Sequence, residues 1–94
     1  KRQITIDYIM ETVADHFHIT MKDLLSSKRN SNIVYPRHIC MYLCRQLTNS
    51  TYEEIGSKIG NRHHSTILHG EEIIKKKLES IKTIDVLTKK IDPQ

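Results

Sequence analysis

One ten-residue stretch of the chain concentrates side chains that can exchange hydrogen bonds. Residues 60–69 read Gly-Asn-Arg-His-His-Ser-Thr-Ile-Leu-His, without an acidic residue. Arginine donates, while histidines and hydroxyls can donate and accept, a combination suited to phosphates and to the edges of nucleic-acid bases. A short helical pattern precedes the stretch at 51–59 and a longer one follows it, so the sequence predicts a helix, a glycine turn and a second helix. This layout is typical of a helix-turn-helix, whose second helix starts in the DNA major groove.

A zinc site is an alternative use of the histidines. Cys40-x3-Cys44 and His64-x4-His69 together have zinc-finger-like spacing. Both pairs fall within predicted helices, however, and the segment between them contains a complete capped helix. The i, i+4 spacing of the cysteines suits a disulfide poorly, and we expect them to be reduced core residues of a cytosolic protein. No metal ligand is therefore assigned, and a zinc-binding interaction module stays as an alternative.

Catalysis and protein binding are two further possible uses of residues that lie close together in the sequence. His63, His64 and Ser65 are adjacent, so they cannot by themselves form a nucleophile, a base and an orienting group, and we do not expect an enzyme. Residues 71–77 carry charges at i, i+4 spacing, which indicates a solvated face or a protein-interaction surface. For the histidines themselves, contact with DNA is the favoured interpretation, and a solvated helix start is the main alternative.

The charge of the chain is unevenly distributed. The 94 residues include 15 basic and 11 acidic ones, for a formal charge of +4. No acidic residue falls between Asp23 and Glu53, whereas four basic ones do. Basic residues gathered on one face are typical of nucleic-acid binding, although a solvated surface is the alternative. The four are Lys28, Arg29, Arg37 and Arg45.

Length and composition predict one domain over residues 1–94. No run of 18 apolar residues is present, so we expect no membrane span, and no signal-peptide pattern is found. The chain begins at Lys1 without a methionine, so we expect it to be a fragment of a longer protein.

Apolar periodicity and capping residues predict an all-α fold of about six helices with a helix-turn-helix core. Threonines at 5, 20 and 51 are placed as N-caps, the last in a capping box with Glu54. Gly60 suits the left-handed position that ends a helix. The expected helices cover 6–17, 20–25, a segment beginning at Pro36 after a polar loop at 26–32, 51–59, a segment beginning near Arg62 or His63, and a last one ending before Pro93.

The same periodicity assigns side chains to the outside or to the core. Arg37 and Arg45 fall off the apolar stripe of their helix, so we expect both to be exposed. Glu71 and Lys75 form an i, i+4 pair that indicates a solvated face. We expect the fifth helix to bury four residues, Ile67, Leu68, Ile74 and Leu78.

Two glycines fall inside predicted helices. Gly56 would permit close approach of the following helix. Gly70 costs on the order of 1 kcal/mol relative to alanine, so we expect packing to require it.

Three stretches of the chain match the pattern of a known family. Residues 23–29 read Asp-Leu-Leu-Ser-Ser-Lys-Arg, and residues 35–43 read Tyr-Pro-Arg-His-Ile-Cys-Met-Tyr-Leu. Ile-Gly at 55–56, followed by 60–69, resembles the signature Ile-Gly-x-x-Phe-Gly-Gly-Arg-Asp-His-Thr-Thr-Val-Leu-His. The chain thus resembles the C-terminal DNA-binding domain of DnaA, the bacterial chromosomal replication initiator. In this comparison residues 23–29 resemble the segment that leads into the family's loop, and residues 35–43 resemble its Pro-Arg-Gln-x-Ala-Met-x-Leu helix. The resemblance runs from about Ile4 to Leu78.

This chain departs from the family pattern at four positions. Glu53 stands in place of proline, Gly70 in place of alanine and Ile73 in place of a basic residue. His63 replaces the aspartate of Arg-Asp-His. An aspartate accepts from the N4 amino group of cytosine, whereas histidine can donate to guanine N7 or O6 or move to a phosphate. We therefore expect altered or relaxed recognition at one base pair.

The resemblance implies a DnaA C-terminal, Trp-repressor-like fold that binds double-stranded DNA at sites similar to TTATNCACA in origin or promoter DNA. It implies base contacts from His63, His64 and Ser65 in the major groove and from Arg29 in the adjacent minor groove. The expected contacts to the DNA backbone come from Lys28, Arg37, His38, Arg45, Thr51, Arg62, Thr66 and His69.

The resemblance also implies what this domain does not carry. The Gly-x-x-x-x-Gly-Lys-Ser/Thr loop of an ATPase does not occur in these residues, so no cofactor is expected here, and ATP would bind an AAA+ module elsewhere in a full-length initiator. Other initiator protomers would be partners through further domains. We expect a cytoplasmic, nucleoid-associated location. A short DnaA-like regulator with altered site preference is the alternative.

Overall fold

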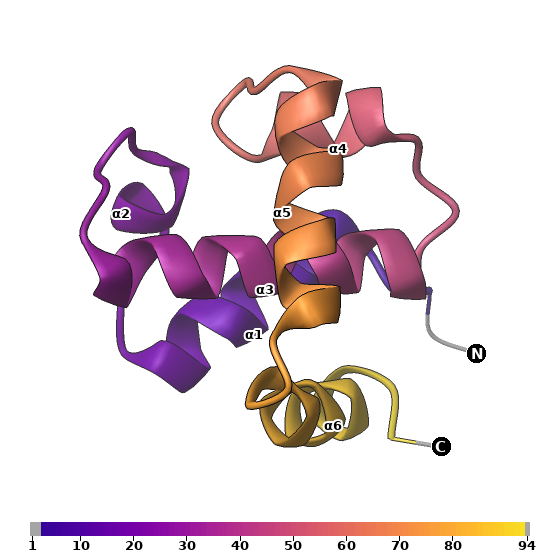
Figure 1. Cartoon of the computed structure of the whole chain (residues 1–94). Helices are drawn as coiled ribbons and strands as arrows, with labels where there is room; N and C mark the ends of the chain where they lie inside the picture. The colour runs from indigo at the N-terminus through magenta and orange to yellow at the C-terminus, as the bar shows by residue number, and fades with distance from the viewer. Residues whose placement is uncertain (1–2, 94) are drawn as a thin grey trace.

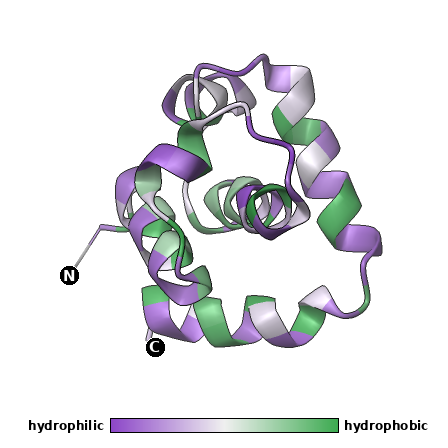
Figure 2. Cartoon of the chain, turned by 90° about the vertical axis from the view of Figure 1, so that its left-hand side faces the viewer, coloured by the Kyte–Doolittle hydropathy of each residue, from purple (hydrophilic) through white to green (hydrophobic). Residues whose placement is uncertain are grey.

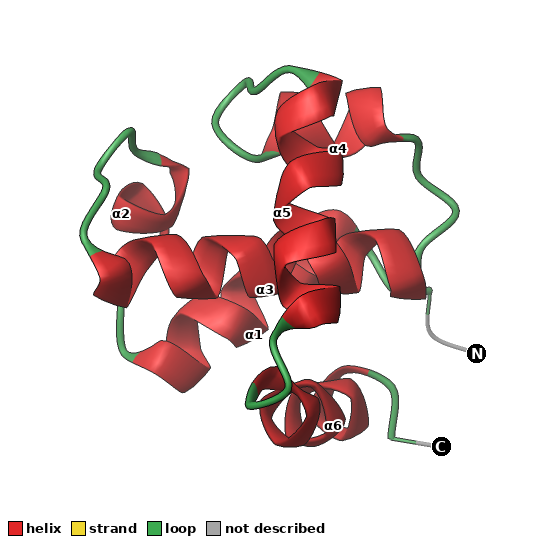
Figure 3. Cartoon of the chain, viewed as in Figure 1, coloured by secondary structure: helices red, strands yellow, loops and turns green. Residues whose placement is uncertain are grey.

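The computed structural model describes residues 3–93, so positions 1, 2 and 94 of the expected 1–94 domain lie outside the described residues. The described part consists of helices joined by short connections and contains no strand, which confirms the all-α prediction (Figures 1 and 3). No helix among these residues is long and apolar enough to cross a membrane. The six helices are α1 (Ile6–Phe17), α2 (Met21–Leu25), α3 (Ser31–Leu47), α4 (Tyr52–Lys58), α5 (His64–Lys76) and α6 (Ser80–Ile91).

The starts of three helices follow from single threonines. Thr5, Thr20 and Thr51 have extended backbone angles, and each hydroxyl accepts a hydrogen bond from the backbone N–H three residues later. Glu54 completes the capping box, because its carboxylate accepts the N–H of Thr51. Such caps each contribute about 0.5–2 kcal/mol and confirm the predicted starts.

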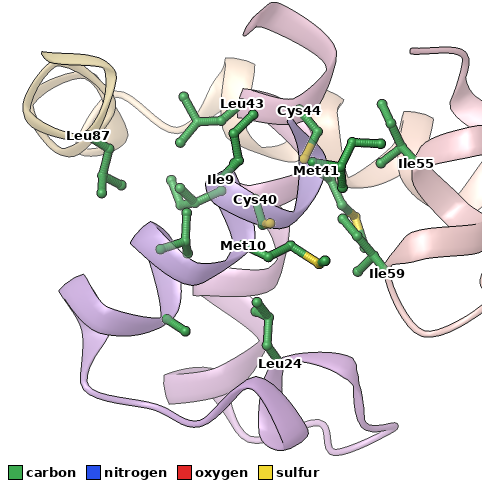
Figure 4. Close-up of a cluster of buried hydrophobic side chains, with 14 of the residues drawn as sticks. Ile9, Met10, Leu24, Cys40, Met41, Leu43, Cys44, Ile55, Ile59 and Leu87 are labelled. Carbon is green, nitrogen blue, oxygen red and sulfur yellow. The ribbon is translucent and has the colours of Figure 1, made fainter. Parts of the chain in front are cut away.

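Helix α3 forms the centre of the fold, and the other helices pack around it (Figure 2 looks along its axis). Helix α5 crosses α3 on one side and also packs on α4, whereas α1 packs on α3 from another side (Figure 1). The core between them is aliphatic and sulfur-rich (Figure 4). Cys40 and Cys44 are wholly buried in it, and a hydrogen bond with Cys44, followed by burial, raises the pKa of Cys40.

The predicted start of the third helix at Pro36 is wrong. Helix α3 begins at Ser31, so Pro36 is its sixth residue, and the loop before it covers 26–30 rather than 26–32. Proline at this position removes the N–H that would bond to the carbonyl of Asn32, at a cost of about 3 kcal/mol. The extra turn buries Ile33 in return, which contributes about 1.5–3 kcal/mol, and extends the helix by five residues.

The predicted buried face of α5 is half wrong. Ile67 and Ile74 are buried, but Leu68 is 40% exposed and Leu78 is 79% exposed. Leu78 lies beyond the end of α5 at Lys76, so the helical period no longer applies to it. The inward stripe is completed instead by Gly70 and by a charged residue described next.

Glu71 is that charged residue, and the expectation of a solvated face is wrong for it. Its side chain is buried, and its carboxylate accepts hydrogen bonds from the Tyr52 hydroxyl at 2.7 Å and the Gln46 amide at 3.3 Å. Lys75 lies 3.8 Å from the same carboxylate. A buried carboxylate with hydrogen-bond partners on two other helices fixes how α5 sits against α3 and α4.

Two arginines, Arg37 and Arg62, hold the α2–α3 loop, and we call them the loop arginines. Arg37 was expected to be exposed but is only 5% exposed. Its three guanidinium nitrogens donate to the carbonyls of Leu24, Lys28 and Asp23 at 2.9, 2.9 and 3.2 Å. Helix α2 packs on α3, which places carbonyls of α2 and of the following loop next to Arg37, and the helical period cannot reveal this contact.

The glycines of α4 and α5 allow close approach, as predicted. A Cβ on Gly56 would overlap the carbonyl oxygen of Arg62, in the turn rather than in the following helix, and would lie 3.4 Å from Ile67. A Cβ on Gly70 would overlap the sulfur of Met41 and lie 3.1 Å from the His38 ring.

These neighbours predict different costs for the two alanine substitutions. A backbone carbonyl cannot move aside, so Gly56→Ala should lower the free energy of unfolding by about 1–3 kcal/mol. The Met41 side chain can shift, and alanine favours a helix, so Gly70→Ala should change it by less than about 1 kcal/mol. Urea unfolding of both variants checks this. Equal losses would contradict the difference between backbone and side-chain contacts.

Removal of the Arg37 guanidinium should also destabilise the fold. Arg37→Met keeps the apolar part of the side chain but removes the donor of the Leu24 and Lys28 carbonyls, at a cost of about 1–3 kcal/mol. The matched control is Arg29→Met on the exposed loop, where a surface substitution should change the free energy of unfolding by less than about 0.5 kcal/mol. A loss as small for Arg37→Met as for the control would show that Arg37 does not hold the loop.

Candidate nucleic-acid interface

The first turn of α5 is built around His63, which is its N-cap. The backbone of His63 is extended, and its Nδ1 accepts the N–H of Ser65 at 3.2 Å. Nδ1 also lies 2.8 Å from the Ser65 hydroxyl. The fifth helix therefore starts within a residue or two of the predicted position, at His64. A histidine here replaces the usual short oxygen-bearing caps.

The side chains of this first turn are exposed. His63, His64, Ser65 and Thr66 all face solvent, and the two imidazole rings stack with centroids 4.1 Å apart. No acidic residue lies in the turn, and the unpaired N–H groups of a helix start carry partial positive charge. The turn thus offers hydrogen-bonding side chains at a position where anions are favoured.

The α2–α3 loop carries the two exposed basic residues predicted there. Lys28 forms an ion pair with Asp23 at 2.9 Å, and the Lys28 hydrogen bond is the main cause that lowers the pKa of Asp23. Exposed pairs of this kind contribute little, so Lys28 can exchange Asp23 for a phosphate. Arg29 is exposed and has no hydrogen bond or ion pair within residues 3–93.

Arg62 brings this loop to the start of α5. Its guanidinium donates to the carbonyl of Ser26 in the loop and to that of Ile59 at 2.9 Å. Its own backbone N–H donates to the carbonyl of Gly56 at 2.7 Å. Gly60 has φ of 70°, as predicted for the end of α4, and Asn61 is also left-handed. The four residues predicted to contact bases therefore lie on two segments that Arg62 joins.

Further residues of the predicted interface line α5 and the facing side of α3. His38 is half-buried beside Gly70, whereas His69 is exposed. Burial lowers the pKa of His38, and the charges of His69, Arg37, Lys77 and Arg62 lower it further. His38 is therefore neutral at pH 7 in the free domain and can serve as a hydrogen-bond donor rather than as a cation.

Lys77 is a basic neighbour of His38 that the sequence pattern did not single out. Its ammonium group lies 5.1 Å from the centre of the Tyr35 ring. Lysines occupy positions 75–77. Because α5 ends at Lys76, Lys77 no longer follows the helical period, and its side chain reaches Tyr35 on α3.

Arg45 and Thr51 belong to the region where α3 ends and α4 begins. In Figure 1 the α2–α3 loop lies to the left of α5 and the α3–α4 connection to its right. Arg45 was expected to be exposed but is half-buried. Its guanidinium donates to the Ser50 carbonyl at 2.8 Å and lies 4.4 Å from the centre of the Tyr52 ring. The Thr51 hydroxyl is exposed, but it caps α4.

The residues of the zinc alternative do not come together. Cys40 and Cys44 are in the core, whereas His64 and His69 are exposed on α5. Within residues 3–93 no group of three or more His, Cys, Asp or Glu side chains is placed to hold a metal ion.

Known proteins match this chain over most of its length. A family model described as the bacterial DnaA protein helix-turn-helix matches residues 6–74. The chromosomal replication initiator proteins DnaA of Lachnoclostridium phytofermentans and Citrifermentans bemidjiense are 48% and 43% identical over 99% and 96% of this chain. That of Geobacter sp. strain M21 is 47% identical over 82% of it. The chain covers 21%, 20% and 17% of the length of these relatives. The chain therefore belongs to the bacterial DnaA helix-turn-helix family of DNA-binding domains.

Proposed function

We propose that this domain binds double-stranded DNA at DnaA-box-like sites, with the first turn of α5 in the major groove and Arg29 in the adjacent minor groove. The observation that carries the proposal is the exposed, acid-free start of α5, joined through Arg62 to an exposed basic loop. A major groove admits an α-helix, and its base edges offer the donors and acceptors that histidine and serine can meet.

The flanks of α5 support this placement. The α2–α3 loop, which contains Lys28 and Arg29, lies on one side of α5, and the α3–α4 connection, which contains Thr51 and accepts a hydrogen bond from Arg45, lies on the other (Figure 1). A helix that lies in the major groove has a phosphate backbone on each side, so groups that can donate hydrogen bonds to phosphate are expected on both. Thr66 and His69 extend the contact along α5 itself.

Arg37 is left out of the proposed phosphate contacts. Its guanidinium nitrogens all donate to backbone carbonyls, so it acts on DNA only through the loop that it holds. Arg62 also holds the loop through backbone carbonyls, but part of its side chain is still accessible to solvent.

The relatives are named as chromosomal replication initiators, so we propose that the DNA site lies in a replication origin or a promoter controlled by the same protein. ATP binding and contacts between protomers would belong to other parts of such an initiator, which acts on the chromosome in the cytoplasm. A short DnaA-like regulator would use the same face on DNA. Selection from random duplex DNA tests the proposal directly, and a failure to enrich any sequence would overturn it.

The affinity for duplex DNA should fall steeply as salt increases. Each neutralised phosphate contributes about −0.9 to the slope of log affinity against log salt concentration. Lys28→Ala should weaken binding to all sequences about equally and make the slope less steep by about one. Fluorescence anisotropy over a series of salt concentrations measures both. Glu72→Ala, on an exposed position of α5, is the control that should not make the slope less steep.

Arg29→Ala should cost more affinity on sites with an A·T-rich flank than on sites with a G·C-rich one. A narrow A·T-rich minor groove has an enhanced negative potential that attracts arginine. Paired titrations with two duplexes that differ only in the flank measure the difference. Equal losses on both duplexes would reduce Arg29 to a phosphate contact.

A further inference from the structure

The N-cap of α5 determines which ring nitrogen of His63 carries the proton. Nδ1 lies 3.2 Å from the backbone nitrogen of Ser65, whose hydrogen points to it. A backbone N–H can only donate, so Nδ1 must present a lone pair. A neutral imidazole has one donor and one acceptor nitrogen, so the hydrogen of His63 lies on Nε2.

The same argument orients the hydroxyl of Ser65. Its oxygen lies 2.8 Å from Nδ1 of His63, which carries no hydrogen. The hydroxyl must therefore be the donor in this contact, and its hydrogen is used within the protein. The oxygen keeps its lone pairs for a group outside the protein, which must donate. Both side chains are exposed at the start of α5.

We propose that His63 and Ser65 present a fixed pair to DNA: the Nε2–H of His63 as a donor and the Ser65 oxygen as an acceptor. This rests on the proposed binding of α5 in the major groove. The donor of His63 fits guanine O6 or N7, adenine N7 or thymine O4, and disfavours cytosine, whose major-groove edge offers only the N4 amino donor. The acceptor of Ser65 fits the amino group of adenine or cytosine at a neighbouring base.

An aspartate at position 63 would reverse the first half of this pattern. It could cap α5 in the same way, but its outward oxygen could only accept, which favours the cytosine amino group. Asparagine separates capping from donation, because its carbonyl oxygen can cap the helix while its NH2 group points outward as a donor. His63→Asn and His63→Asp are therefore a pair of equal size that differs in the outward donor and in the negative charge of aspartate, and the charge should change the affinity for every sequence about equally.

The test compares the wild type with both variants on a bound duplex in which each base pair is replaced in turn. Wild type and His63→Asn should share one profile. His63→Asp should gain preference for cytosine at one base by about tenfold, within the range for a good base contact. Matching profiles for His63→Asn and His63→Asp, or one profile for all three proteins, would overturn the inference.

Nitrogen NMR of the free, labelled domain tests the proton position without DNA. The ring of His63 should show a protonated Nε2 and an unprotonated Nδ1 at neutral pH, and a protonated Nδ1 would overturn the inference. If none of the three proteins prefers any duplex sequence, the proposed function fails and base recognition fails with it, while the NMR result still decides the proton position.

Ser65→Ala tests the second half of the pattern. It removes the hydroxyl but keeps the N–H that His63 caps, so the fold should persist. Preference for a base with an amino group should relax at one position by roughly five- to tenfold, with the preference at the His63 position unchanged. An unchanged profile at every base would show that Ser65 accepts nothing from DNA.

Discussion

The candidate interface depends on a single residue, Arg62, which donates hydrogen bonds to the backbone carbonyls of three residues. Its backbone N–H donates to the Gly56 carbonyl, and its guanidinium donates to Ile59 and to Ser26. The first of these bonds closes the turn between α4 and α5, and the last joins that turn to the α2–α3 loop. Two segments far apart in sequence thereby become one surface, and the loop is ordered before any DNA is bound, which reduces the entropy lost on binding.

Both loop arginines are held by backbone carbonyls rather than by acidic side chains. Burial lowers the pKa of Arg37, and the charge of Arg62 lowers it further, yet arginine remains charged at physiological pH. Carbonyl dipoles satisfy the guanidinium donors without adding a negative charge. The interface therefore keeps its positive potential, which an Arg–carboxylate pair would have cancelled.

The acidic group that orients α5 is kept away from its first turn. Glu71 lies two turns further along, buried between the Tyr52 hydroxyl and the Gln46 amide. The Arg45 guanidinium lies over the ring of the same Tyr52 whose hydroxyl donates to Glu71. Because a buried carboxylate must keep its partners, this network resists rotation of α5 about its axis, and that rotation would turn His63 and Ser65 away from a base edge.

The sequence by itself determined that about six helices form, the threonine caps of α1, α2 and α4, and the left-handed Gly60, because caps, glycine turns and apolar periods act over a few residues. The family and the position of the exposed first turn of α5 were also predictable, since the spacing of residues 60–69 specifies both. Only the tertiary structure decided the long-range polar contacts. Packing of α2 on α3 buries Arg37, hydrogen bonds from Tyr52 and Gln46 accompany the burial of Glu71, and burial of Ile33 extends α3 across a proline. These outcomes depend on which distant carbonyls, hydroxyls and core spaces meet each side chain, and a periodic pattern contains no information about them.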